Sequence, residues 1–334
     1  MNPAAVVTGL GTTAPETVVT NEMVARGLDT SDEWIRTRTG IRERRVVTSG
    51  TATSDLAVDA GRNALKSAGL DEVGALVLAT TTPDHPCPAT APTVAYGLGL
   101  GEIPAFDVSA VCSGFLYGLA SGAGLIAAGV ADTVLVVAAE AFTTIIDPTD
   151  RNTAPIFGDG AGAVVLRAGK TSEAGALLGL DLHSNGSMAE LIMTPAGGSR
   201  QRSSGRVAEP HEHFMGMQGR TVFVNAVMKM EQSSRTALAA TGWETGDVDW
   251  LIGHQANARI LSAVAERLEI PAERAYINLD RYGNTAGASI PLALGGAADE
   301  GLLTAGHRVL LTAFGGGATW GAVTLRWPEI VPVV

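Results

Sequence analysis

The stretch AFDVSAVCSGFLYGLASGAGLIAAG, residues 105–129, decides the fold that we expect. Its first four residues, 105–108, form a short apolar run before polar loop residues, as is typical of a buried parallel strand. Residues 113–128 follow with small residues along the packing face, which predicts a closely packed helix. A strand that leads into a helix is part of a βαβ unit, and such units place helices on both faces of a sheet.

The same succession of strand and helix recurs along the chain. Short apolar runs predict further strands at residues 75–80, 133–138, 162–166, 250–253, 275–279, 308–313 and 321–325. Longer stretches predict helices at residues 53–68, 222–241, 258–268 and 290–300. The predicted strands are parallel, except that the last two are close enough to form a hairpin. The second half repeats the order of the first, so the sequence predicts an α/β protein with an internal duplication.

Residues 170–218 separate the two predicted halves and are polar and rich in glycine and serine. This composition predicts a strand followed by a long surface loop at 184–218, which we interpret as a lid or an interface element. We place the boundary at Gly169, which gives an N-terminal half of residues 1–169 and a C-terminal half of residues 170–334.

The composition excludes several classes of protein. The 334 residues are 46% hydrophobic and 17% charged, which is typical of a globular enzyme with about two folding units. A formal net charge of -11 argues against a nucleic-acid partner, because phosphate neutralisation needs a basic surface. The start resembles no signal peptide and no long apolar run is present, so we expect no membrane association.

The chain has two cysteines, Cys87 and Cys112, and no CxxC motif. This pattern predicts neither a disulfide framework nor a thiolate metal site, and it favours a cytoplasmic location. His211 and His213 lack an evident third ligand, and GLGTTA at residues 9–14 lacks the helix of a dinucleotide site. We therefore expect no metal and no bound cofactor.

Cys112 is the candidate nucleophile, because it lies between a predicted strand and the helix that follows it. The helix dipole and free backbone amides would stabilise the thiolate and lower the pKa below its usual value of about 8.5. The alternative is that Cys112 is a small buried apolar residue, as most free cysteines are. Cys87 lies in the proline-rich loop TTTPDHPCPAT without a helix behind it, so we do not expect it to be catalytic.

Two polar residues occupy comparable positions in the second half. His254 follows the predicted strand 250–253, and Asn284 lies in RYGNTAGASIP after the predicted strand 275–279. Ligands of open α/β sheets gather beyond the carboxyl ends of strands, so the duplication would bring both residues and Cys112 to one crevice. The plainer interpretations are a core histidine and a helix N-cap. The glycines 315–317 suit either close backbone approach to a reacting carbonyl or a tight turn.

Six motifs in a fixed order resemble the β-ketoacyl-acyl-carrier-protein synthase III family of the thiolase superfamily, which includes polyketide-priming ketosynthases. They are TSDEWIRTRTGIRERR (30–45), AFDVSAVCSGF (105–115), DPTDRNTAPIFGDGAGA (147–163), HQAN (254–257), GNTAGASIP (283–291) and AFGGGATWG (313–321). The resemblance implies a thiolase-like fold with five layers, αβαβα, and a homodimer.

The resemblance also implies an acyltransferase that uses coenzyme A thioesters as substrates. An acyl group from acyl-coenzyme A would load onto Cys112. Decarboxylative Claisen condensation with a malonyl thioester would then give a 3-oxoacyl product that initiates fatty acid or polyketide synthesis. His254 and Asn284 would bind the malonyl thioester oxygen, and the amides of Cys112 and Gly316 would form the oxyanion hole.

The same resemblance assigns binding residues. Those for coenzyme A are Thr30, Trp34, Arg38, Arg151, Gly219 and Asn257; those of the acyl pocket are Cys87, Phe157 and Phe314; and Arg259 would dock the carrier protein. The extender would be malonyl-acyl-carrier protein or malonyl-coenzyme A.

This chain departs from the family pattern in two places. Val224 and Glu266-Arg267 stand where basic residues are frequent, so we expect weaker or different carrier docking. Cys87 stands where a larger residue often closes the partner's acyl pocket, so we expect starters longer or more branched than acetyl.

Alternative reactions remain open from the sequence. A thiol hydrolase would use His254 to deprotonate Cys112 and pass the acyl group to water. An acyltransferase would pass that group to a hydroxyl or an amine. A non-catalytic binding protein is disfavoured, because all three polar catalytic positions are filled.

Overall fold

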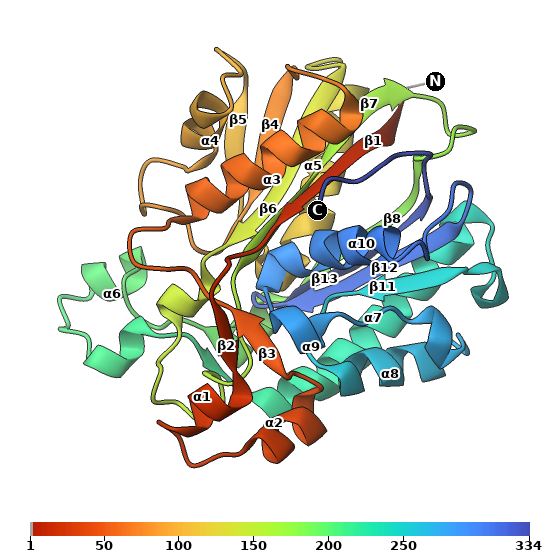
Figure 1. The fold of residues 1–334 in the computed structure, drawn as a ribbon. Helices are drawn as coiled ribbons and strands as arrows, with labels where there is room; N and C mark the ends of the chain where they lie inside the picture. Colours follow the sequence, from red (N-terminus) through yellow and green to blue (C-terminus); the bar gives the residue numbers. More distant parts are fainter. Residues whose placement is uncertain (1–2) are drawn as a thin grey trace.

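The computed structural model describes residues 3–334, which form two large sheets with helices between them and on their outer faces (Figure 1). The first sheet has the order β1-β7-β6-β4-β5. Its strands are β1 (Ala4–Thr13), β7 (Gly160–Gly169), β6 (Thr133–Glu140), β4 (Ala75–Ala79) and β5 (Ala105–Val108). Strands β6, β4 and β5 are parallel, whereas β7 runs antiparallel to both β1 and β6. The expectation of a parallel strand at 162–166 is therefore wrong in direction.

The second sheet repeats this pattern with the order β8-β13-β12-β11. Its strands are β8 (Leu177–Ser184), β13 (Thr319–Arg326), β12 (Arg308–Gly315) and β11 (Trp250–Gly253). The two pairings that involve β13 are antiparallel and the β12–β11 pairing is parallel, as at the matching places of the first sheet. The predicted duplication and the terminal hairpin are confirmed.

The predicted strand 275–279 is wrong, because only Ala275 pairs with the sheet, through a parallel bridge to Leu251. At the matching position of the first sheet, a complete strand, β5, pairs with β4. The chain then turns away, because the Asn278 amide donates to the Gln255 side chain at 3.1 Å and helix α9 (Leu279–Tyr282) begins.

Strand β1 was missed by the sequence analysis, which took Gly9 and Gly11 only as a false dinucleotide motif. Both glycines lie under helix α3 (Thr53–Ala68), and a Cβ on either of them would collide with the backbone of Ala64. Glycine is therefore needed for close packing of strand and helix, although it weakens the sequence signal of a strand.

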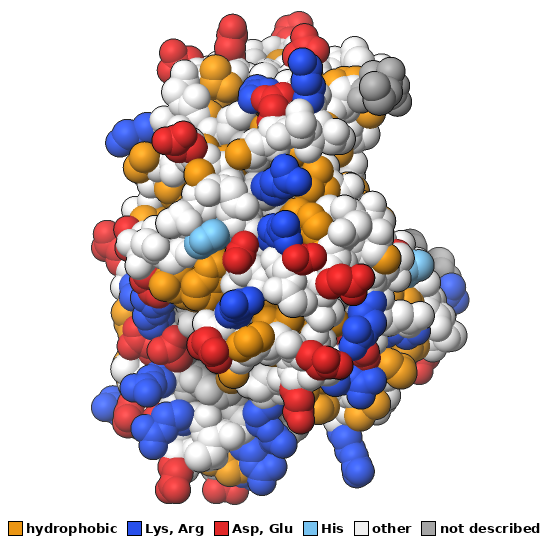
Figure 2. Space-filling model, turned by 90° about the vertical axis from the view of Figure 1, so that its right-hand side faces the viewer, with side chains coloured by type: hydrophobic (Ala, Val, Ile, Leu, Met, Phe, Trp, Pro, Cys, Tyr) orange, Lys and Arg blue, Asp and Glu red, His pale blue; other side chains and the backbone are white. Residues whose placement is uncertain are grey.

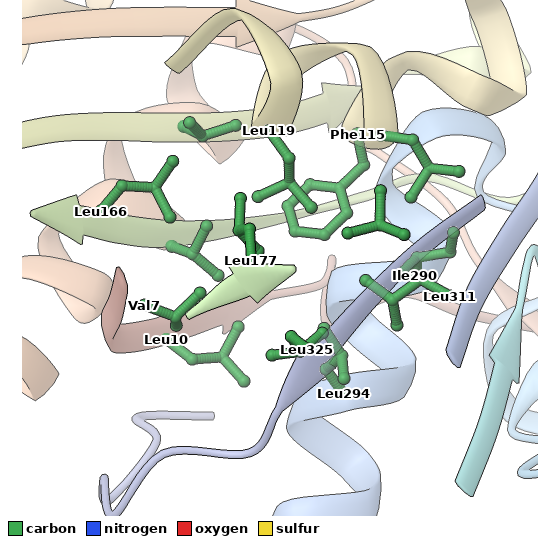
Figure 3. Packing of buried hydrophobic residues seen from close by; sticks show 14 of the residues in the cluster. Val7, Leu10, Phe115, Leu119, Leu166, Leu177, Ile290, Leu294, Leu311 and Leu325 are labelled. Atoms are coloured by element: carbon green, nitrogen blue, oxygen red, sulfur yellow. The ribbon is translucent and has the colours of Figure 1, made fainter. Parts of the chain in front are cut away.

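Two helices lie between the sheets: α5 (Gly114–Ala127) and α10 (Ser289–Asp299). Side chains of both helices meet side chains of both sheets in one core (Figure 3), for example Phe115, Ile290, Leu166 and Leu311. Helices α3 and α4 (Ala91–Gly97) cover the other face of the first sheet, and α7 (Gly219–Thr241) and α8 (Ala258–Arg267) cover that of the second. The five-layered αβαβα arrangement and the predicted helices are thus confirmed, while α4 was not predicted.

The remaining elements form two excursions. Near the N-terminus, β2 (Val18–Thr20), α1 (Asn21–Ala25), α2 (Asp32–Thr39) and β3 (Glu43–Arg45) lie beside the second half, at the bottom of Figure 1. Between β8 and α7 lie η3 (Gly186–Leu191), β9 (Ile192–Met193), α6 (Ser199–Ser203), η4 (Pro210–His213) and β10 (Gly216–Met217). The loop predicted at 184–218 thus contains a small two-stranded sheet, in which β9 pairs with β10.

The face shown in Figure 2 carries acidic and basic side chains side by side, with small groups of hydrophobic side chains between them. Neither sign of charge dominates this face. Among residues 3–334, no helix is long and apolar enough to cross a membrane.

Candidate active site

Cys112 lies in the short helix η1 (Val111–Ser113), between β5 and α5, and is only 6% exposed. The preceding Val111 has φ +49°, a left-handed conformation that is uncommon for a β-branched residue. Such a conformation persists only where the surroundings hold it, and it is frequent at active sites. A Cβ on Gly315 would lie 2.7 Å from the Cys112 amide nitrogen, so β12 packs directly on the turn that carries the thiol.

Burial and the nearby Glu140 raise the pKa of the Cys112 thiol, while a backbone hydrogen bond lowers it. The predicted decrease of this pKa is therefore wrong. The site is closed and lined by apolar side chains, so desolvation of a thiolate outweighs the helix dipole. The raised pKa means that Cys112 is a protonated thiol at neutral pH.

His254 follows β11 and is buried, with its backbone amide bound to the Thr312 carbonyl at 2.8 Å. Its Nδ1 lies 2.7 Å from Ser289 Oγ, which also accepts the Gln255 amide at 3.2 Å. The hydroxyl proton of Ser289 can therefore bond Nδ1, and in that arrangement the ring proton lies on Nε2. Burial lowers the pKa of His254 to about 3, so the imidazole is a neutral donor.

The buried His254 predicts a specific acid sensitivity of the fold. Its folded-state pKa of about 3 lies below the ordinary 6.5, so the unfolded chain binds more protons between these values. The contribution of the neutral His254 to the free energy of unfolding is therefore complete above about pH 6.5. As the pH falls from there toward 3, the free energy of unfolding decreases by up to about 1.4 kcal/mol per pH unit. Denaturant unfolding of wild type and His254→Gln at pH 7 and pH 5 should show a steeper loss for wild type. Parallel losses in the two proteins would contradict the assignment.

Asn284 lies between α9 and η7 (Ala286–Ala288) and is 5% exposed. Its backbone forms a bridge with Phe157, in which the Asn284 amide donates to the Ile156 carbonyl at 2.9 Å. Its side-chain Oδ1 accepts the Ala286 amide at 2.9 Å. This bond fixes the carboxamide so that Nδ2 is the donor left for a ligand. The N-cap interpretation is wrong, because the N-cap residue of η7 is Thr285.

Cys112, His254 and Asn284 line one cavity of about 40 Å³. Its other walls are mostly apolar and include Phe142, Phe157, Phe314, Ile192 and Met217. The rings of Phe142 and Phe157 are stacked at 4.7 Å. The structure therefore brings the three predicted catalytic residues together, with the predicted Phe157 and Phe314 beside them. Phe142 was missed, although it lies only two residues after the end of β6 at Glu140.

A second cavity of about 740 Å³ shares Met217, Val222, Ala256, Ile260 and Asn284 with the first. Five predicted residues line it, namely Trp34, Arg38, Gly219, Asn257 and Arg259. They come from α2, α7, α8 and the turn before α8, and Asn257 Nδ2 donates to the Arg38 carbonyl at 3.0 Å. An open, partly basic cavity therefore leads to the small apolar one that contains the thiol.

Four predicted residues lie elsewhere. The Arg151 guanidinium stacks on Trp34 at 4.9 Å, next to the large cavity. Thr30 has a buried hydroxyl without a partner among the described residues. Gly316 packs against Ile192 and Val111, and thus lies beside the turn of Cys112. Cys87 is exposed and lines neither cavity.

The doubled five-layered fold, with a thiol, a neutral imidazole and a carboxamide in one apolar cavity, defines a condensing enzyme of the thiolase type. The family model of 3-oxoacyl-[acyl-carrier-protein] synthase III matches residues 106–186, and the model of its C-terminal part matches residues 238–327. The chain belongs to the β-ketoacyl-[acyl-carrier-protein] synthase III family and is a condensing acyltransferase.

Relatives match this chain over its whole length. Beta-ketoacyl-[acyl-carrier-protein] synthase III 5 of Streptomyces coelicolor is 56% identical over 99% of both chains. The solved 3-oxoacyl-(acyl carrier protein) synthase III of Pseudomonas aeruginosa PAO1 has a TM-score of 0.93 and 50% identity, and the match covers 98% of this chain and 100% of that one. The priming β-ketosynthase of the R1128 polyketide pathway has a TM-score of 0.90 and 32% identity, with 98% and 97% covered.

Proposed function

We propose that Cys112 carries the acyl group and that His254 and Asn284 stabilise the enolate of the extender. The main support is the convergence of these three side chains in one apolar cavity, with Nε2 and Nδ2 as the available donors. The family places the chain among condensing enzymes, which disfavours the hydrolase and heteroatom acyltransferase alternatives.

Acylation begins with attack of the Cys112 sulfur on the thioester carbonyl of acyl-coenzyme A. The carbon–sulfur bond to coenzyme A breaks, and the thiol proton leaves with the coenzyme A sulfur. The amides of Cys112 and Gly316 are our proposed oxyanion hole for this step, because fixed donors stabilise a charge that develops near them.

Condensation begins when the malonyl thioester loses carbon dioxide, and the electrons of the broken carbon–carbon bond form an enolate. The enolate oxygen accepts hydrogen bonds from His254 and Asn284. Its carbon attacks the acyl carbonyl on Cys112, which releases the 3-oxoacyl thioester and a cysteine thiolate that takes a proton from solvent. A neutral imidazole suits this role because it still carries one N–H that can donate to the enolate oxygen, while the buried ring remains uncharged.

The large cavity supports coenzyme A thioesters as substrates. Trp34 and Arg38 would hold the nucleotide together with Thr30 and Arg151, while Asn257 and Gly219 would contact the pantetheine arm. We propose malonyl-acyl-carrier protein as the extender and Arg259 as its docking cation, because the names of the relatives include an acyl-carrier protein. The apolar Val224, 58% exposed at the same mouth, supports a less charged docking surface, with malonyl-coenzyme A as the alternative extender.

A homodimer through strand β5 is also part of the proposal. Strand β5 is one of the two outer strands of the first sheet, and an outer strand has unpaired backbone groups that another chain can bind. Phe106 on β5 and Tyr96 on α4 are 37% and 87% exposed. The exposed Cys87, just before α4, would then contact the partner's acyl pocket.

Both cysteines are free thiols, which supports a cytoplasmic location.

Starter preference tests the proposed reaction. The cavity beside Cys112 has a volume of about 40 Å³. A starter longer than acetyl therefore needs more space, and in the proposed homodimer the small side chain of Cys87 leaves that space open in the acyl pocket of the other subunit. With malonyl thioester present, isobutyryl- and hexanoyl-coenzyme A should give 3-oxoacyl product, with one carbon dioxide each, at higher kcat/KM than acetyl-coenzyme A. Cys87→Phe should reduce the use of long starters more than that of acetyl. A clear preference for acetyl would contradict the starter class, and free acid without carbon dioxide would contradict condensation.

A further inference from the structure

Glu140 is a fully buried carboxyl group that the proposed mechanism does not use. It is the last residue of β6. Four donors surround its carboxylate. The Thr81 amide lies 3.0 Å from Oε2, the Thr81 hydroxyl 3.1 Å from Oε1 and the Thr82 hydroxyl 3.1 Å from Oε2, and the Gly287 amide is the fourth donor. A buried carboxylate with this many bonds is held firmly in place.

These donors come from both halves of the molecule. Thr81 and Thr82 follow strand β4, whereas Gly287 lies in η7, three residues after Asn284. A Cβ on Gly287 would lie 3.1 Å from Glu140 Oε1 and 3.1 Å from the Val111 carbonyl. The carboxylate therefore lies behind the turn of Cys112 and bonds to the turn that follows Asn284.

The bonded network continues away from the active site into the first half. The Thr82 hydroxyl also accepts the Ala141 amide at 3.0 Å, and the Thr53 hydroxyl donates to the Thr82 carbonyl at 2.5 Å. Thr53 thus belongs to the same buried cluster but does not contact the carboxylate. This difference makes Thr53 a suitable position for a control.

Charge connects Glu140 to the thiol as well. Burial is the largest cause of the raised pKa of Cys112, and the charge of Glu140 is the second. Burial also raises the pKa of Glu140 itself, to about 7. The other titratable groups nearby are engaged or neutral. Asp84 and Asp159 bind amides of neighbouring loops, and His254 across the cavity is uncharged. Cys112 is therefore the group on which the Glu140 charge acts.

We propose that Glu140 is a positioning residue of the active site, which anchors the η7 turn beside Asn284 and holds a negative charge behind Cys112. The enolate part of this inference rests on the proposed function, whereas the effect on the thiol does not. Loss of the Glu140 charge is expected to change the reactivity of the thiol and the rate of decarboxylation in opposite directions. Removing the charge should make Cys112 more reactive as a thiol and make decarboxylation slower, which a merely structural residue would not do.

The test compares wild type, Glu140→Gln and Thr53→Val. Alkylation of Cys112 by iodoacetamide at pH 8, where Glu140 with a pKa of about 7 is mostly ionised, is followed by peptide mass spectrometry, which scores Cys87 separately. Loss of the charge should lower the thiol pKa by about one unit, so Glu140→Gln should alkylate about tenfold faster. Release of carbon dioxide from malonyl-coenzyme A should fall about tenfold to hundredfold, because a displaced donor stabilises the enolate poorly. Thr53→Val removes neither a charge nor a bond to the carboxylate, so it should stay within about twofold of wild type in both assays.

Alkylation of Glu140→Gln that is no faster than that of Thr53→Val would overturn the proposal, as would unchanged decarboxylation. If Glu140→Gln does not fold, Thr81→Val removes one donor and favours the neutral acid, so its alkylation should be faster than wild type; no increase would overturn the proposal. A wild-type enzyme without decarboxylation would contradict the proposed function instead, and the alkylation comparison would still decide the role of the charge.

Discussion

His254→Ala and Asn284→Ala are each expected to lower condensation by about 10²- to 10³-fold while Cys112 still takes up the acyl group. Each substitution removes one of two fixed donors to the enolate oxygen, and loss of one such donor typically costs this much in kcat. Acylation uses the backbone amides of a different oxyanion hole. The two proposed sets share no group, because Nε2 and Nδ2 are side-chain atoms of His254 and Asn284, whereas the other set consists of the backbone amides of Cys112 and Gly316.

The two half-reactions can be measured separately. Intact-protein mass spectrometry follows acylation by acyl-coenzyme A, and carbon dioxide release follows decarboxylation of the malonyl thioester. Asn225→Ala, on α7 and outside both cavities, is the matched control and should behave as wild type. Equal loss of acylation and decarboxylation in the His254 and Asn284 variants would mean that these residues activate the thiol rather than the enolate.

Gly315→Ala is expected to lower the acylation rate of Cys112 by about a hundredfold. The new methyl would lie 2.7 Å from the Cys112 amide nitrogen and 3.0 Å from that of Ser113. Both are backbone atoms, so either the Cys112 turn or strand β12 must shift. A shift of about 1 Å in a reacting group is enough for a loss of this size.

Gly124→Ala is the control for this substitution, because it lies in α5 and a Cβ there meets no atom within 4 Å. It should acylate normally and gain stability, since alanine favours a helix over glycine by roughly 0.5–1 kcal/mol. Acylation rates and thermal unfolding of both variants give the comparison. If Gly315→Ala folds and acylates at the wild-type rate, the close packing of β12 on the nucleophile turn has no catalytic role.

The positions of the proposed catalytic residues in the fold were predictable from the sequence. Cys112 and His254 each follow a short apolar strand, and the carboxyl ends of parallel strands share one edge of a sheet. The doubled order of strands then indicated that the two edges meet. The structure confirms this expectation, because the cavity contains both residues and Asn284.

Properties that depend on long-range packing were not predictable. The helix after Cys112 suggested a lowered thiol pKa, but burial by Phe142 and Phe157 has the larger effect. Glu140 gave no signal, because its donors come from positions about 60 and 150 residues away in the chain and sequence spacing does not reveal such contacts. The proposed binding residues Trp34 and Arg38 were implied only by the family resemblance. Spacing could not indicate them, because α2 is held at the cavity by a contact with Asn257, which is far away in the sequence.

The central claim is that Cys112 is the acyl carrier, and intact-protein mass spectrometry tests it most directly. Wild type and Cys112→Ala are incubated with a mixture of acyl-coenzyme A thioesters and weighed. We predict that wild type gains the mass of one acyl group and that Cys112→Ala gains none, although Cys87 remains as an exposed thiol. Equal acylation of the two proteins would contradict the assignment of the nucleophile.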